Sequence, residues 1–187
     1  MNTTSIVILI VVIAGVAAAI FVFLRTRSQR LRTRFGPEYD RTIQETGSRY
    51  RAEAKLQKLE KRVEGFAIHP LRPEDAGKFR DAWRALQTRF VDDPKVAVSE
   101  ADRLLGQVMT ERGYPVSNFD ERSSEISVNH PVVVENYRAG HEIALRHAQG
   151  KASTEDMRQA MIHYRMLFEE LVGEPEKARV QGAGDKA

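Results

Sequence analysis

The sequence contains no cysteine among its 187 residues. This absence excludes disulfide bonds, thiol catalysis and cysteine-based zinc sites. The phosphate-binding GxxxxGK[ST], the dinucleotide-binding GxGxxG and the nucleophile motif GxSxG are also missing. So are HExxH and the Glu-x-x-His pairs of di-iron bundles. The sequence therefore predicts no catalytic residue, no metal site and no cofactor.

A strand pattern is lacking as well. No segment alternates apolar and polar residues over a useful length, whereas apolar residues recur every three or four positions. We therefore predict an all-α chain with a compact helical bundle over 73–172. Its helices are expected to begin at caps such as Asp93 before Pro94, and Ser153 with Asp156.

Acidic residues are absent from the first 37 positions, and the stretch Ile6–Leu24 carries no charge at all. A helix of this length just crosses the ~30 Å hydrocarbon core of a bilayer. The alternative is a cleaved signal peptide, which has a positive leader and a shorter apolar run. Here the tail 1–5 has no Lys or Arg, and the apolar run continues past Ala19. We predict an uncleaved transmembrane helix over 6–24.

Arginine dominates the segment 25–36 that follows. Because basic residues beside a span stay in the cytoplasm, we predict a single-pass inner-membrane protein with its N-terminus outside and its C-terminal domain cytoplasmic. The same side chains can attract anionic lipid headgroups, although setting the topology alone accounts for the cluster. Gly15 and Ala19 form a small-xxx-small pair that permits a homo-oligomer. The predicted membrane-surface residues are Arg25, Arg27, Arg30, Arg32 and Arg34.

Beyond the arginines, a long membrane-proximal stalk helix is expected over 37–66, with a kink allowed at Gly47-Ser48. The tail 173–187 is charged and contains glycine, and it is predicted to be disordered. From Gly65 onward the chain has 17 basic and 20 acidic residues. A nucleic-acid partner is therefore not expected.

One histidine stands out, because His141 lies on an apolar helical stripe with Tyr137 one turn earlier. If the last two long helices form an antiparallel hairpin, His141 lies level with Tyr164. We predict a ligand-binding site at these three residues, with Glu142 nearby. The alternative is a buried imidazole that is hydrogen-bonded to a tyrosine.

Five motifs lie within the stretch from Trp83 to Leu171, which is about half of the chain: FVDDP at 90–94, EADRLL at 100–105, RGYP at 112–115, HPVVVENYR at 130–138 and STEDMRQAMIHYRMLFEEL at 153–171. Together they resemble an uncharacterised family of bacterial proteins described as membrane or secreted proteins. The resemblance implies a bacterial source and a helical domain behind an N-terminal hydrophobic segment. It implies no activity or ligand.

Three hypotheses for function follow. The first is a non-enzymatic interaction or scaffolding module with an unknown protein partner, using the stalk and a groove near Trp83, Tyr114 and Tyr137. The second is a ligand or pH sensor, or a small enzyme, built on the His141 site. The third is a secreted or envelope-facing helical domain.

Overall fold

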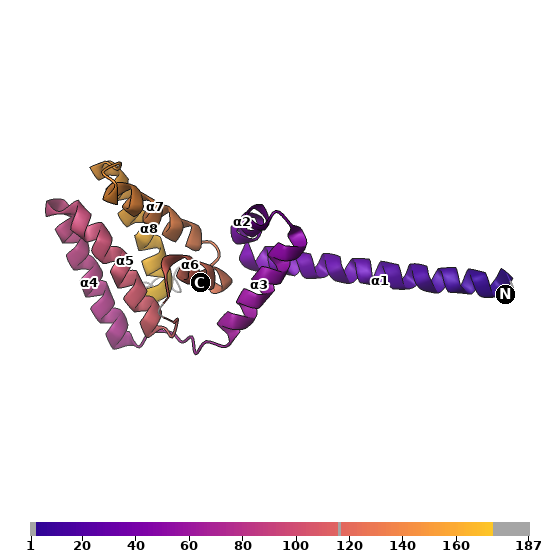
Figure 1. The fold of residues 1–187 in the computed structure, drawn as a ribbon. Helices are drawn as coiled ribbons and strands as arrows, with labels where there is room; N and C mark the ends of the chain where they lie inside the picture. The colour runs from indigo at the N-terminus through magenta and orange to yellow at the C-terminus, as the bar shows by residue number, and fades with distance from the viewer. Residues whose placement is uncertain (1–2, 116, 174–187) are drawn as a thin grey trace, which may run out of the picture. The chain divides into compact units, whose positions relative to one another are not determined.

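The computed structural model describes residues 3–115 and 117–173, with side chains from residue 11 onward. Within these ranges it contains eight helices and no strand, so the predicted all-α class is confirmed (Figure 1). The chain divides into two compact units, residues 1–58 and 59–187, and each is described by itself. The predicted disorder of the tail concerns residues that lie, except for Gly173, outside the described ranges.

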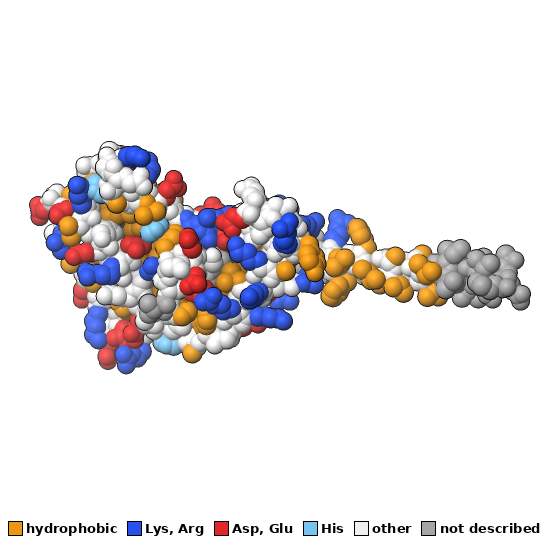
Figure 2. All heavy atoms as spheres, in the orientation of Figure 1, with side chains coloured by type: hydrophobic (Ala, Val, Ile, Leu, Met, Phe, Trp, Pro, Cys, Tyr) orange, Lys and Arg blue, Asp and Glu red, His pale blue; other side chains and the backbone are white. Residues whose placement is uncertain are grey.

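The first helix, α1 (Thr3–Phe35), runs without a break through the predicted span and the arginine segment. Every side chain from Val11 to Leu24 is exposed, and Figure 2 shows apolar side chains around this part of the helix. By length and composition α1 can cross a membrane, although a signal sequence would meet the same test. The helix continues past Leu24 because arginine is a good helix former.

The expected single stalk helix over 37–66 is instead two helices, α2 (Pro37–Thr46) and α3 (Arg49–Glu64). The chain turns at Gly36, with φ +49°, and at Gly47, with φ +63°. Both values favour glycine, because a side chain is strained in the left-handed region. Gly47 donates its N–H to the carbonyl of Ile43 and so ends α2. The kink that the sequence allowed at this point is a complete break.

Up to residue 173, and leaving residue 116 aside, the bundle in the second unit contains five helices that begin and end close to the predicted caps. The Asp93 carboxylate accepts the N–H of Val96 at 3.1 Å, and Ser153 and Asp156 form the expected capping box. Residues 131–133 form a turn, so the HPVVVENYR helix begins three residues after its proline. The helices are α4 (Pro73–Asp92), α5 (Pro94–Glu111), α6 (Phe119–Asn129), α7 (Val134–Ala148) and α8 (Thr154–Val172).

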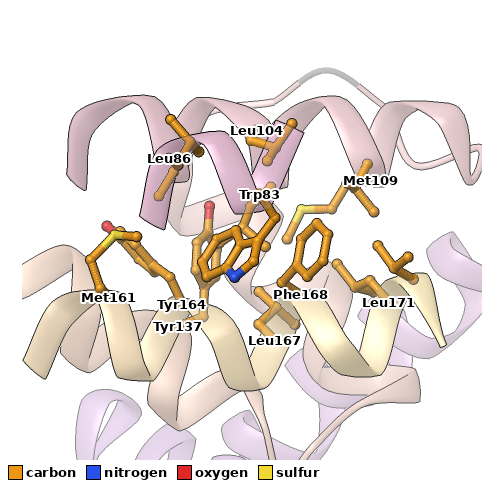
Figure 3. Packing of buried hydrophobic residues seen from close by; sticks show 14 of the residues in the cluster. Trp83, Leu86, Leu104, Met109, Tyr137, Met161, Tyr164, Leu167, Phe168 and Leu171 are labelled. Carbon is orange, nitrogen blue, oxygen red and sulfur yellow. The ribbon is translucent and has the colours of Figure 1, made fainter. Parts of the chain in front are cut away.

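A continuous apolar core holds these helices together (Figure 3). Helix α8 packs against α4, α5 and α7, and α4 packs against α5. The single tryptophan, Trp83, stacks on Phe168 with ring centroids 4.7 Å apart. The three side chains named beside the predicted partner groove, Trp83, Tyr114 and Tyr137, are at most 5% exposed, so other residues would have to line such a groove. They belong to the core and offer no surface to a partner.

The RGYP motif is a structural joint within the second unit. Gly113 has φ +91°, and a Cβ there would lie 2.3 Å from the carbonyl oxygen of Ala67. Arg112 accepts the N–H of His69 on its carbonyl at 3.0 Å and donates a guanidinium N–H to the carbonyl of Leu171 at 3.2 Å. The motif thus fastens the connector before α4 and the end of α8 to the end of α5.

Candidate functional site

The bundle brings together five polar or aromatic side chains that we call the Asp102 centre: Asp102 of α5, Arg122 of α6, Tyr137 and His141 of α7, and Tyr164 of α8. The rings of Tyr137 and Tyr164 are fully buried, with centroids 6.1 Å apart (Figure 3). Nδ1 of His141 lies 3.9 Å from Oδ1 of Asp102. The structure therefore brings the three sequence-predicted residues together, around an acid that the sequence did not single out.

Two glycines inside helices make room for this centre. A Cβ at Gly140 would lie 2.7 Å from Cε1 of Tyr164, and one at Gly106 would lie 2.6 Å from Nη1 of Arg122. A glycine in a helix interior costs about 1 kcal/mol relative to alanine. The ring of Tyr164 explains the glycine at 140, whereas the end of the Arg122 side chain could move aside from a side chain at 106.

His141 does not make the expected hydrogen bond to a tyrosine, so that prediction is wrong. Its imidazole instead stacks on Phe119, with ring centroids 3.5 Å apart and planes at 8°. Burial lowers the pKa of His141; the charge of Arg122 lowers it too, while Asp102 and Asp120 oppose the shift. The side chain is therefore mainly neutral at neutral pH.

Four buried polar atoms of the centre have no hydrogen-bond partner among the described residues: Oδ1 of Asp102, the hydroxyl oxygens of Tyr137 and Tyr164, and Nε of Arg122. Burial, followed by the charge of Asp102, raises the pKa of both tyrosines, so they stay protonated and remain donors. Donors facing a carboxylate suit the retention of a small polar molecule or a water. They do not form an activated nucleophile, and Glu142 is exposed.

A buried acid of the second unit, Glu125, lies on α6. The Glu125 side chain is 1% exposed, and Nη2 of Arg62 lies 3.0 Å from its Oε1. Burial raises the pKa of Glu125, and the charge of Arg62 opposes that shift. The Arg62 side chain is half exposed, so one screened cation faces a buried carboxylate.

The first unit contains a groove of about 640 Å³, which we call the Arg25 groove. Two of the predicted membrane-surface residues, Arg25 and Arg32, line it, whereas Arg27 donates a hydrogen bond to Gln57. The lining residues are Phe21, Leu24, Arg25, Ser28, Gln29, Arg32, Arg49, Tyr50 and Glu53.

Glu53 holds the three helices of the first unit together. Its Oε1 accepts hydrogen bonds from Ser28 of α1, from the Tyr39 hydroxyl of α2 at 2.8 Å, and from Nε of Arg49 of α3 at 3.0 Å. Burial alone would raise the pKa of Glu53, but the three donors outweigh it and lower the pKa. The carboxylate therefore stays ionised at neutral pH.

Metal ligation finds no support in the described part of the chain, where no group of three or more His, Asp or Glu side chains could hold an ion. Two of the histidines have separate partners: His130 lies 2.8 Å from Glu170, and His163 lies 2.9 Å from Asn136.

No protein-family model, curated protein or solved structure matches the chain. The resemblance drawn from the motifs therefore stays a prediction. The features of the molecule that bear on function are the Asp102 centre, the Arg25 groove and the apolar part of α1.

Proposed function

We propose that the protein is a single-pass protein of the bacterial inner membrane, whose cytoplasmic helical bundle is a non-enzymatic interaction module. The observation that carries this proposal is the surface of α1. From Val11 to Leu24 all its side chains are exposed, and none is charged. So much contiguous apolar surface is unfavourable in water and favourable in a bilayer.

The continuity of α1 supports an uncleaved anchor over a signal peptide. The helix does not change at Ala17–Ala19, where a signal peptidase would find small residues. Farther along the same helix, the side chains of Ser28, Leu31 and Phe35 are buried. Cleavage near Ala19 would leave the exposed apolar side chains of Phe21 and Leu24 on the surface of a soluble protein.

The arginines support the orientation. They follow the apolar stretch directly, without an intervening acid, and such a cluster is retained in the cytoplasm. Residues 1–5 before the span carry no Lys or Arg that would oppose this orientation. This arrangement would expose the bundle to cytosolic partners.

Reporter fusions test the topology. Reporters that are active only in the cytoplasm or only in the periplasm are joined after Ala187, and the membrane fraction is extracted with alkaline carbonate. We expect a cytoplasmic signal and a product of full mass that resists extraction. A periplasmic signal would contradict the orientation, and a product shortened near Ala19 would contradict the anchor.

Chemical crosslinking in cells tests the interaction role. We expect the full-length protein to crosslink reproducibly to a cytosolic protein of one kind. Gly15, whose Cβ position has no neighbour within 4 Å, leaves room for a second α1 instead. Crosslinks to the protein itself alone would replace the interaction module with a homo-oligomer.

A second candidate function, sensing of pH or of a small polar ligand by the Asp102 centre, is favoured by the four buried polar atoms that lack partners. The test is the chemical shift of the His141 ring as pH is lowered, in the wild type and in Asp102→Asn. A sensor requires that protonation of His141 moves the resonances of α6 through Phe119. A titration that changes only His141 itself would reject it.

A further inference from the structure

We propose that the Arg25 groove binds the phosphate headgroup of an anionic phospholipid. The groove lies where the uncharged stretch of α1 ends and its arginines begin. This inference rests on the proposed anchor, because only a helix that spans the bilayer brings the groove to headgroup level. It goes beyond the anchor by assigning a binding site to particular arginines.

The lining of the groove has two chemical parts. Phe21 and Leu24 extend the apolar surface of the span into it, which suits the upper part of an acyl chain. Arg25, Arg32 and Arg49 supply three cations at the other part. A ligand that matches both parts is amphipathic and anionic, as a phospholipid is and a free phosphate is not.

The guanidinium groups remain available to a phosphate. Arg49 uses its Nε on Glu53 and Tyr39, which leaves its terminal nitrogens to make further bonds. The pair between Arg32 and Asp40 is 3.5 Å long, and both side chains are more than half exposed. A pair of this kind is weak in water, so a phosphate can compete with it by accepting two parallel bonds.

The one acid in the lining does not cancel this charge. Three donors already occupy Oε1 of Glu53, and the groove lining holds three arginines against this single carboxylate. Tyr50, 83% exposed at the groove, is a residue type enriched at the water boundary of membranes. Charge, apolar lining and the tyrosine all point to the same ligand.

The arginine segment provides its own charge-matched control. Arg25 and Arg32 line the groove, whereas Arg27 and Arg30 are not among its lining residues. Arg25→Gln with Arg32→Gln therefore removes the same charge as Arg27→Gln with Arg30→Gln. General attraction to an anionic surface falls equally in both, whereas binding in the groove falls in the first alone.

The experiment measures lipid retained on the full-length protein in detergent, by native mass spectrometry with phosphatidylglycerol or phosphatidylcholine added. The wild type should retain phosphatidylglycerol preferentially. The groove variant should bind it about tenfold or more weakly, since two phosphate contacts are lost, and the control variant less than about threefold. Circular dichroism checks that both variants remain helical.

Equal losses in the two variants, or no preference for phosphatidylglycerol, would overturn the proposal. Displacement of the lipid by millimolar glycerol phosphate would also overturn it, because the site would then recognise a soluble phosphate. Carbonate extraction of the same variants keeps the two proposals apart. If the protein resists carbonate extraction but shows no lipid preference, only the lipid site in the groove is refuted. If carbonate releases the protein from the membrane, the transmembrane anchor is refuted.

Discussion

Each unit of the molecule has a glutamate that is largely covered, Glu53 in the first and Glu125 in the second, and their pKa values move in opposite directions. In the first unit, Glu53 is 15% exposed and accepts three hydrogen bonds, and its pKa is lowered. In the second, Glu125 is 1% exposed and faces one arginine that is half exposed, and its pKa is raised. Burial acts in the same direction on both. The number of donors therefore decides which form of the side chain the fold favours.

The same contrast extends to how the units are held together. The second unit has a continuous apolar core in which Trp83, Tyr137 and Tyr164 are all covered. The first unit buries Ser28, Glu38 and Thr42 beside a few large apolar side chains, while its longest apolar stretch faces outward. A membrane would supply the apolar environment that the protein provides for itself in the bundle.

The largest expected effect is the removal of an aromatic ring from the core of the second unit. Phe168→Ala deletes the ring that stacks on Trp83 and should lower the free energy of unfolding by about 3–5 kcal/mol. Urea unfolding followed by the fluorescence of Trp83, the single tryptophan, reports on this unit alone. The control Val132→Ala, at a side chain 75% exposed, should change stability by less than about 0.5 kcal/mol. A loss below about 1 kcal/mol for Phe168→Ala would contradict the core.

A smaller loss is expected when the polar junction of the first unit is removed. Glu53→Ala leaves the Ser28 and Tyr39 hydroxyls and the Arg49 guanidinium without their shared acceptor, which should cost about 1–2 kcal/mol because Arg49 is exposed. Hydrogen exchange should speed up in α3 and stay unchanged in α8. Faster exchange in both helices would show that the comparison between the units is wrong.

Two glycine substitutions test whether tight packing includes the Asp102 centre. Alanine in a helix normally stabilises by about 1 kcal/mol over glycine, as expected for Gly77→Ala, where the added Cβ has no neighbour within 4 Å. Gly140→Ala should instead destabilise by about 1–3 kcal/mol, because its Cβ meets the Tyr164 ring. Thermal unfolding of the two variants should shift in opposite directions. A shift of the unfolding temperature in the same direction for both variants would mean that the Tyr164 ring moves aside freely.

The smallest effect concerns pH. Because the pKa of Glu53 is lowered in the folded state, its ionised carboxylate stabilises the fold at pH values above the ordinary pKa of 4.5. This contribution is lost as pH falls through the folded-state pKa of Glu53. Glu125, with its raised pKa, contributes most below 4.5 and loses that contribution as pH rises through its folded-state pKa. Carboxyl ¹³C titration should place the midpoints on opposite sides of 4.5. Arg62→Ala should raise the midpoint of Glu125 further, and two midpoints on the same side would refute the contrast.

Local chemistry made much of the fold predictable. Asp93 and Ser153 mark helix starts because their side chains bond the first free N–H groups, and the uncharged stretch of α1 follows from composition alone. The Asp102 centre was only partly predictable. Tyr137 and His141 share an apolar stripe, but Asp102 lies outside the apolar stripe of its own helix, so its sequence position predicts a solvent-exposed side chain.

The first unit was the least predictable, because α3 returns to α1 through the non-local bond between Ser28 and Glu53. No periodicity within either helix encodes that contact. It also explains why the Arg25 groove could not be inferred from the arginine cluster alone. Arg49 is distant from Arg25 in sequence, and the two line the same groove because α3 packs back against α1.

The place of α8 in the bundle also fixes an order of events during synthesis. Helix α8 is the last described helix, yet it packs against α4, α5 and α7, and Trp83 finds its stacking partner only when Phe168 has been made. Helix α1 leaves the ribosome before the bundle helices, and the bundle cannot close until α8 has been translated. The apolar surface of α1 is therefore complete before the domain behind it can fold. During that interval its core-forming segments are open to chaperones.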